Sequence, residues 1–130
     1  MPGMATTPCR VLVVDDEKDT AQTLAALLVG MGHEATFLTD PQQVFATAER
    51  IKPHVIFLDI GMPAMDGWQV ARVLREQYPG EGQLRLVAIS GHGAPEHHAR
   101  SRQAGFDAHV LKPLAVDLIE SIIRQLAPPC

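Results

Sequence analysis

Short apolar runs alternate with segments of helical periodicity along almost the whole of this 130-residue chain. The apolar runs are too short to be buried helices, and the segments between them repeat apolar residues at helical spacing. We predict strands at residues 10–14, 34–38, 55–58, 84–89 and 106–111, and helices at residues 17–29, 41–51, 67–78, 95–104 and 115–126. This alternation predicts an α/β domain whose parallel strands are joined by right-handed helical crossovers.

The predicted strands are apolar almost throughout, which is typical of a parallel sheet covered by helices on both faces. In such a doubly wound sheet, ligands bind beyond the carboxyl ends of the strands, where the strand order reverses. The residues that follow each strand are therefore the candidate functional residues. One predicted helix, 95–104, differs from the others because its only apolar residues are Ala99 and Ala104. It is either a loosely held surface helix or a mobile recognition face.

The overall composition argues against several classes of protein. The formal net charge of −4 argues against binding to nucleic acid, which requires a basic surface. No apolar run reaches the roughly 20 residues of a membrane span, and the start of the chain does not have the pattern of a signal peptide. We interpret Cys9 and Cys130, the only cysteines, as reduced thiols rather than as a disulfide between the two ends. Together these features indicate a cytoplasmic protein that does not associate with membranes.

Charged and hydroxyl side chains stand at the carboxyl ends of four predicted strands. They are Asp15, Asp16 and Glu17 after the first strand, Asp59 after the third, Ser90 after the fourth and Lys112 after the fifth. Because parallel strands end at one edge of a sheet, three aspartates should converge there with a hydroxyl group and a lysine. Clustered carboxylates repel one another unless a cation compensates, and all-oxygen ligands suit Mg²⁺. Such a cluster is equipped to receive a phosphoryl group, and a carboxylate can be the nucleophile that forms an aspartyl phosphate.

Four motifs that contain these residues occur in order along the chain: VLVVDDE, VIFLDIGMPAMDG, LVAISG and HVLKP. Together they resemble the receiver domains of two-component response regulators. The resemblance implies a flavodoxin-like fold, in which a five-stranded parallel sheet of strand order 2-1-3-4-5 is flanked by five helices. It also implies a receiver domain at residues 10–126, between an N-terminal tail at residues 1–9 and a C-terminal tail at residues 127–130.

The same resemblance implies roles for the acidic residues. Asp59 would be the phospho-acceptor and would also contribute to a Mg²⁺ site. Asp16 would bind Mg²⁺ directly and Asp15 would bind it through water. The backbone carbonyl of Gly61 would complete the protein's share of the metal site.

The later motifs would supply the residues that bind the phosphoryl group and act as a switch. Ser90 would hydrogen-bond the phosphoryl group, Lys112 would form an ion pair with it, and the peptide bond from Lys112 to Pro113 would be cis. His109 departs from the common pattern, which has a tyrosine or phenylalanine there, and looks closest to receivers of hybrid sensor kinases. We expect His109 to turn inward toward Ser90 only when its imidazole is neutral; the alternative is that it stays outward as part of a partner surface.

The implied function is a phosphorylation switch rather than an ordinary turnover enzyme. A partner histidine kinase, or a histidine phosphotransfer protein, would donate the phosphoryl group, and the domain would catalyse its own phosphorylation and dephosphorylation. The chain would be a stand-alone regulator or the receiver module of a hybrid kinase, with an unknown output partner.

Two other functions would also use this set of residues. A Mg²⁺-dependent phosphohydrolase can also use an aspartyl phosphate. Such enzymes of the haloacid-dehalogenase type place a second Asp two residues after the nucleophile, whereas here Glu17 stands two residues after Asp15. A degenerate receiver that serves only as a scaffold is disfavoured because every acidic position is filled.

Three histidines and one tryptophan could suggest further sites, but simpler roles suit them. His97 and His98 are neighbours that point to different sides of a helix, so we interpret them and His92 as surface residues rather than metal ligands. Trp68 lies at the start of a predicted helix and is interpreted as a packing residue rather than a stacking platform.

Overall fold

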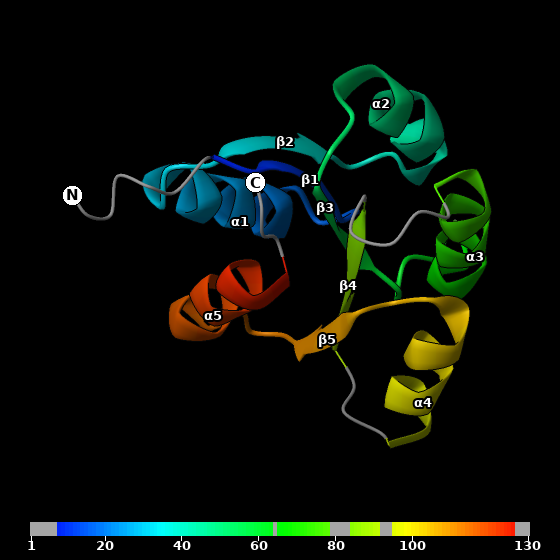
Figure 1. Cartoon of the computed structure of the whole chain (residues 1–130). Coiled ribbons are helices and arrows are strands. Elements are labelled where there is room, and N and C mark those ends of the chain that lie inside the picture. The colour runs from blue at the N-terminus through cyan, green and yellow to red at the C-terminus, as the bar shows by residue number, and fades with distance from the viewer. Residues whose placement is uncertain (1–7, 64, 79–83, 92–94, 127–130) are drawn as a thin grey trace.

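The computed structural model describes residues 8–63, 65–78, 84–91 and 95–126. Five strands form one sheet in the order β2-β1-β3-β4-β5, as the sequence predicted (Figure 1). The strands are β1 (Arg10–Val14), β2 (Glu34–Leu38), β3 (Val55–Asp59), β4 (Arg85–Ser90) and β5 (Ala108–Leu111). Every neighbouring pair is parallel, so all the carboxyl ends of the strands lie at one edge of the sheet.

Five α-helices of the described part of the chain cover the two faces of this sheet. They are α1 (Lys18–Gly30), α2 (Val44–Ile51), α3 (Gly67–Gln77), α4 (Pro95–Ala104) and α5 (Val116–Leu126). Helices α1 and α5 lie on one face, and α2, α3 and α4 lie on the other (Figure 1). None of the helices in the described residues is both long enough and apolar enough to cross a membrane.

Alternate residues of each central strand contribute to two hydrophobic cores, one on each face. In β1, Val11 and Val13 belong to the core beneath α1 and α5, whereas Leu12 and Val14 belong to the core beneath α2, α3 and α4. All four residues are buried. A strand that is buried on both faces has no polar side to show, which explains why its sequence is an uninterrupted apolar run.

The helix predicted at residues 41–51 begins instead with a 3₁₀ turn, Pro41–Gln43, before α2. The Asp40 side chain accepts a backbone N–H of this turn at 3.0 Å, as an N-cap residue does. A short 3₁₀ segment at the start of an α-helix is common, and residue periodicity does not distinguish the two. The other predicted boundaries lie within about two residues of the observed ones.

Two histidines close the edge at which the strands begin. The Nδ1 atom of His33 accepts the Cys9 N–H at 3.0 Å, and that of His54 accepts the Arg10 N–H at 2.9 Å. Both bonds require an unprotonated Nδ1, and burial lowers the pKa of each histidine below its ordinary value. The Arg10 guanidinium donates in turn to two carbonyl groups at the end of α2, both at 3.0 Å.

The interpretation of the cysteines as reduced thiols is wrong for Cys9. Cys9 is buried in the core beneath α1 and α5, and it is disulfide-bonded rather than a reduced thiol. Pairing of cysteines depends on how closely they approach in space, which their separation along the sequence does not reveal. Cys130, the only other cysteine of the sequence, lies outside the described residues. His92 and the side chains of His97 and His98, which we interpreted as surface residues, lie outside them too.

Candidate functional site

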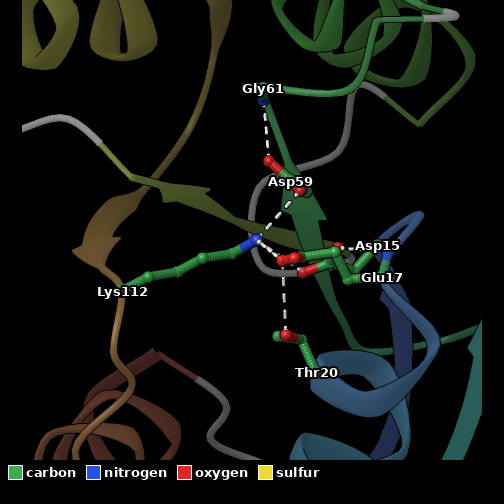
Figure 2. Close-up of polar contacts among 6 residues, drawn as sticks. All are labelled: Asp15, Glu17, Thr20, Asp59, Gly61 and Lys112. Atoms are coloured by element: carbon green, nitrogen blue, oxygen red, sulfur yellow. Dashed lines mark hydrogen bonds and ion pairs between the residues drawn. The ribbon is translucent and has the colours of Figure 1, made fainter.

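The carboxyl edge of the sheet gathers the charged residues that the sequence placed at the ends of strands. Asp15 follows β1, Asp59 ends β3, Ser90 ends β4 and Lys112 follows β5. Figure 2 shows the Lys112 side chain reaching from the end of β5 to the carboxylates beside β1 and β3. Asp59, Ser90 and Lys112 line one cavity of about 440 Å³ at this edge.

Three carboxylates lie close together at the carboxyl edge of the sheet. One oxygen from each of Asp15, Asp16 and Asp59 lies within 4.8 Å of the others. Asp15 is 0% exposed and Asp59 4%, whereas Asp16 is exposed. Burial and the neighbouring charge of Asp59 raise the pKa of Asp15 to about 6, although the backbone hydrogen bond from Glu17 and the nearby Lys112 ammonium group oppose the rise. The fold therefore holds negative charge where water solvates it poorly.

The two oxygens of the Asp15 carboxylate differ in their hydrogen bonds. Its Oδ1 accepts the Glu17 backbone N–H at 2.9 Å. Its Oδ2 accepts no hydrogen bond from any described residue, although it lies 3.2 Å from the Lys112 Nζ. A buried oxygen without a donor requires a compensating partner, and clustered carboxylate oxygens are the ligands that Mg²⁺ prefers. The donor set of Asp15, Asp16 and Asp59 therefore fits Mg²⁺.

Lys112 is shared among three carboxylates. Its Nζ donates hydrogen bonds to Glu17 Oε1 at 2.9 Å and to Asp59 Oδ2 at 3.2 Å, and it forms an ion pair with Asp15 (Figure 2). Burial alone would lower the pKa of Lys112, but the hydrogen bond to Glu17 and the charges of Asp59 and Asp15 raise it above its ordinary value. The lysine therefore stays protonated and supplies a positive charge beside Asp59. Its peptide bond to Pro113 is cis, the isomer that the resemblance implied.

Glu17 belongs to this group, and sequence reasoning gave it no role. It is the N-cap residue of α1, yet its side chain makes no capping hydrogen bond. Its carboxylate accepts instead from Lys112 and, at 3.5 Å, from the Thr20 hydroxyl group (Figure 2). The hydrogen bond from Lys112 lowers the pKa of Glu17. The available signal was a third consecutive acid after Asp15 and Asp16, at a strand end that meets the lysine.

The Asp59 carboxylate is held from two sides. The Gly61 backbone N–H donates to Oδ1 at 2.7 Å, and Lys112 donates to Oδ2 at 3.2 Å. A Cβ atom on Gly61 would lie 3.3 Å from Oδ1, so glycine leaves the carboxylate its space. This contact is made by the Gly61 N–H, and the role of its carbonyl as a metal ligand stays a prediction.

The start of α3 lies directly against the segment that follows Asp59. A Cβ atom on Gly67 would lie 2.7 Å from the Ile60 Cα, which is closer than such atoms approach. The preceding residue, Asp66, accepts the Trp68 N–H at 3.0 Å and so caps the helix. The Asp-Gly pair therefore begins α3 and also allows it to pack against the Asp59 segment.

Trp68 connects the cavity to α4. Its side chain lines the cavity and packs against the core beneath α2, α3 and α4, so its predicted packing role is confirmed. Its Nε1–H donates to the Ser101 hydroxyl at 3.0 Å, and the Arg100 guanidinium lies over the ring, 4.1 Å from its centroid. Ser101 is buried. These polar contacts help to hold a helix that has few apolar residues.

Ser90 and His109 line different cavities. Ser90 is buried and faces the cavity that contains Asp59. His109 lies opposite Ala88 in the register of β4 and β5, and it lines a separate cavity of about 200 Å³ together with Ser101 of α4. The structure thus places His109 next to α4, on the strand that pairs with the one ending in Ser90. Its action as a switch stays a prediction.

The sequence matches a known family over almost its whole length. Residues 11–124 match the family model of the response regulator receiver domain. The chain is 33% identical over 119 residues to the probable transcriptional regulatory protein TcrX of Mycobacterium tuberculosis, covering 92% of this chain and 50% of that protein. It is 31% identical over 120 residues to an uncharacterized 14.6 kDa protein of Leptolyngbya boryana, covering 92% of this chain and 88% of that protein.

Solved structures show the same fold. Chemotaxis protein CheY4 of Vibrio cholerae matches with a TM-score of 0.84 at 22% sequence identity, over 92% of this chain and 99% of that chain. Several curated relatives are much longer than this chain, which spans half of their length or less.

Proposed function

This chain belongs to the family of response regulator receiver domains, which act in two-component signalling, and we propose that it is a phosphorylation-dependent switch whose phospho-acceptor is Asp59. The observation that carries the proposal is the environment of Asp59. One oxygen of this buried carboxylate is held by a backbone N–H, and the other contacts the charged end of Lys112. A partner histidine kinase, or a histidine phosphotransfer protein, would supply the phosphoryl group.

The proposed step transfers the group from a phosphohistidine of the partner. An Asp59 oxygen forms a bond to phosphorus while the bond between phosphorus and the imidazole nitrogen breaks; the electron pair stays on the imidazole, which takes up a proton. Lys112, which contacts Asp59, would face the charge that develops on the phosphoryl oxygens, and the Ser90 hydroxyl would donate a hydrogen bond to them. When bound at Asp15, Asp16 and Asp59, Mg²⁺ would supply further positive charge to the phosphoryl oxygens.

A groove beside the site offers a surface for the donor protein. It has a volume of about 560 Å³ and lies between α1 and the segment after β5, where Pro113 and Leu114 line it. It shares Gly91 and Lys112 with the cavity that contains Asp59. We propose that the donor rests in this groove, because a phosphohistidine must reach Asp59 while other contacts hold its protein in place.

Labelling with a small phospho-donor tests the proposal. Acetyl phosphate with Mg²⁺ should raise the intact mass of the wild-type protein by one phosphoryl group and should leave Asp59→Asn unchanged. Chelation with EDTA should prevent labelling of the wild type if the aspartates hold a required cation. Labelling that survives in Asp59→Asn, or that proceeds fully in EDTA, would contradict the assignment.

We propose that the domain spans residues 10–126, works in the cytoplasm and does not itself bind nucleic acid, in keeping with a net charge of −4. His109 would contribute to switching through the cavity beside α4. A Mg²⁺-dependent phosphohydrolase is not favoured, because the family match is to receiver domains.

A further inference from the structure

Lys112 is divided between the proposed phospho-acceptor and a second acid, Glu17. An ammonium group has three N–H donors. Two of them are directed at Glu17 Oε1 and Asp59 Oδ2, at 2.9 Å and 3.2 Å, and the same nitrogen lies 3.2 Å from Asp15 Oδ2. A phosphoryl group on Asp59 would bring new oxygens that compete with the existing partners for this charge.

The three acids differ in what their release would cost. Asp15 is fully buried, so separating it from Lys112 would leave a charge without solvent. The Glu17 side chain is 64% exposed, so water can replace the lysine at little cost. Asp59 is the residue on which the phosphoryl group would form. Glu17 is therefore the partner that can leave.

We propose that Glu17 is a positioning residue that holds Lys112 in the unphosphorylated domain and competes with the phosphoryl group for it. The inference rests on the proposed transfer to Asp59 and adds a determinant of its equilibrium. Glu17 stabilises the unmodified site through its hydrogen bond from Lys112. Thr20 donates to the Glu17 carboxylate from the first turn of α1, which keeps the carboxylate near the lysine.

The local geometry makes Glu17 a convenient residue to replace. Its side chain makes no capping hydrogen bond to α1, so its replacement removes no bond to a backbone N–H of the helix. Glu17→Gln removes the charge and keeps the length of the side chain. Glu17→Ser removes the charge and introduces a residue that caps helices well, so it should preserve or increase stability.

A double-mutant cycle tests whether Glu17 acts through Lys112. Beryllofluoride, a phosphoryl analogue, would be titrated at saturating Mg²⁺ into the wild type, Glu17→Gln, Lys112→Ala and the double variant. Glu17→Gln and Glu17→Ser should each tighten binding by about two- to five-fold, the scale of an exposed ion pair. The gain should vanish in the Lys112→Ala background. Asp117→Asn, which removes an exposed charge from α5, should bind like the wild type.

A structure of the beryllofluoride complex gives a second test that needs no lysine variant. In the wild-type complex, Lys112 should contact the analogue, and Glu17 should lie beyond hydrogen-bond distance of Lys112. Unchanged affinity in both Glu17 variants, a gain that persists in Lys112→Ala, or a complex in which Lys112 still donates to Glu17 would each overturn the inference. Equal binding of beryllofluoride to the wild type and Asp59→Asn would overturn the proposed function as well, which separates the two failures.

Discussion

At the edge where the strands begin, His33 and His54 accept backbone N–H groups, and Arg10 donates to backbone carbonyls. At the edge where the strands end, Lys112 is shared among three acids. One buried oxygen of Asp15 there accepts no hydrogen bond from a described residue. The fold provides hydrogen-bond partners for these groups of the first edge, whereas at the second edge it leaves a buried carboxylate oxygen without a hydrogen bond from a described residue. Such local departures from stability mark functional sites. The comparison therefore locates the site on energetic grounds, independently of the family match.

The largest effect should come from removing the buried charge of Asp15. Its pKa is raised from 3.8 to about 6, so above that pH the carboxylate is less favourable in the folded chain than in the unfolded one. Asp15→Asn should raise the free energy of unfolding of the metal-free protein by up to about 3 kcal/mol at neutral pH. Urea denaturation in EDTA measures this. The gain should disappear below about pH 4, where the carboxyl group is protonated in both states.

A matched control distinguishes burial from charge. Glu76→Gln removes an exposed acid of α3 and should change stability by less than about 0.5 kcal/mol. A loss of stability in Asp15→Asn would mean that the contacts of Asp15 with Glu17 and Lys112 outweigh its burial, and the contrast between the two edges would fail.

Gly67→Ala should disturb the carboxyl edge through the backbone. The added Cβ would lie 2.7 Å from the Ile60 Cα, so α3 or the segment after Asp59 must shift, at a cost of about 1–3 kcal/mol in thermal or urea unfolding. Labelling of Asp59 by acetyl phosphate should weaken as well. Gly30→Ala is the control, because no atom lies within 4 Å of its Cβ position and alanine favours the helix. Equal effects of the two substitutions would show that the close approach does not matter.

Acid should lower the stability of the protein through His33 and His54, whereas it should raise the stability through Asp15. The folded-state pKa values of His33 and His54 lie below 6.5, so the unfolded chain binds more protons, and stability should fall as pH drops from about 6.5 toward those values. The slope cannot exceed about 1.4 kcal/mol per pH unit for each histidine. Asp15→Asn is the suitable background, since the Asp15 carboxyl changes stability in the other direction between about pH 4 and 6.

Replacement of both histidines tests the assignment of this slope. His33→Gln with His54→Gln should flatten the pH dependence between about pH 5 and 6.5, because glutamine does not titrate. An unchanged slope would assign the acid sensitivity to groups elsewhere in the chain.

The smallest effect concerns the link from the cavity to α4. Trp68→Phe keeps the ring and removes the donor to Ser101, which should cost about 1 kcal/mol of unfolding free energy. Ser101→Ala in the same background should add little, because the two residues share one hydrogen bond. Fully additive losses would mean that the bond does not stabilise the protein.

The positions of Asp15, Asp59, Ser90 and Lys112 could be predicted because they follow from topology. Once the apolar runs are recognised as parallel strands, the residues after them must meet at one edge. The alternation of helices and strands was sufficient for that step, and it required no knowledge of side-chain conformations.

The contacts of Glu17 and Trp68 could not be predicted in the same way. The pairing of Glu17 with Lys112 depends on which of several acids the flexible lysine reaches, and the bond from Trp68 to Ser101 depends on how α3 and α4 cross. The disulfide of Cys9 likewise depends on spatial proximity. These features arise from tertiary packing between segments far apart in the sequence, where periodicity carries no information.

Trp68 is the only tryptophan of the sequence, and it lies where the Asp59 cavity and α4 meet. The intrinsic fluorescence of the protein therefore comes mainly from a single indole group with a defined electrostatic surrounding. Ions that enter the cavity change the field at the ring, and movement of α4 changes the contacts of the indole with Arg100 and Ser101. Emission intensity and wavelength should thus follow both events in real time, without an attached dye, in a titration or a stopped-flow trace.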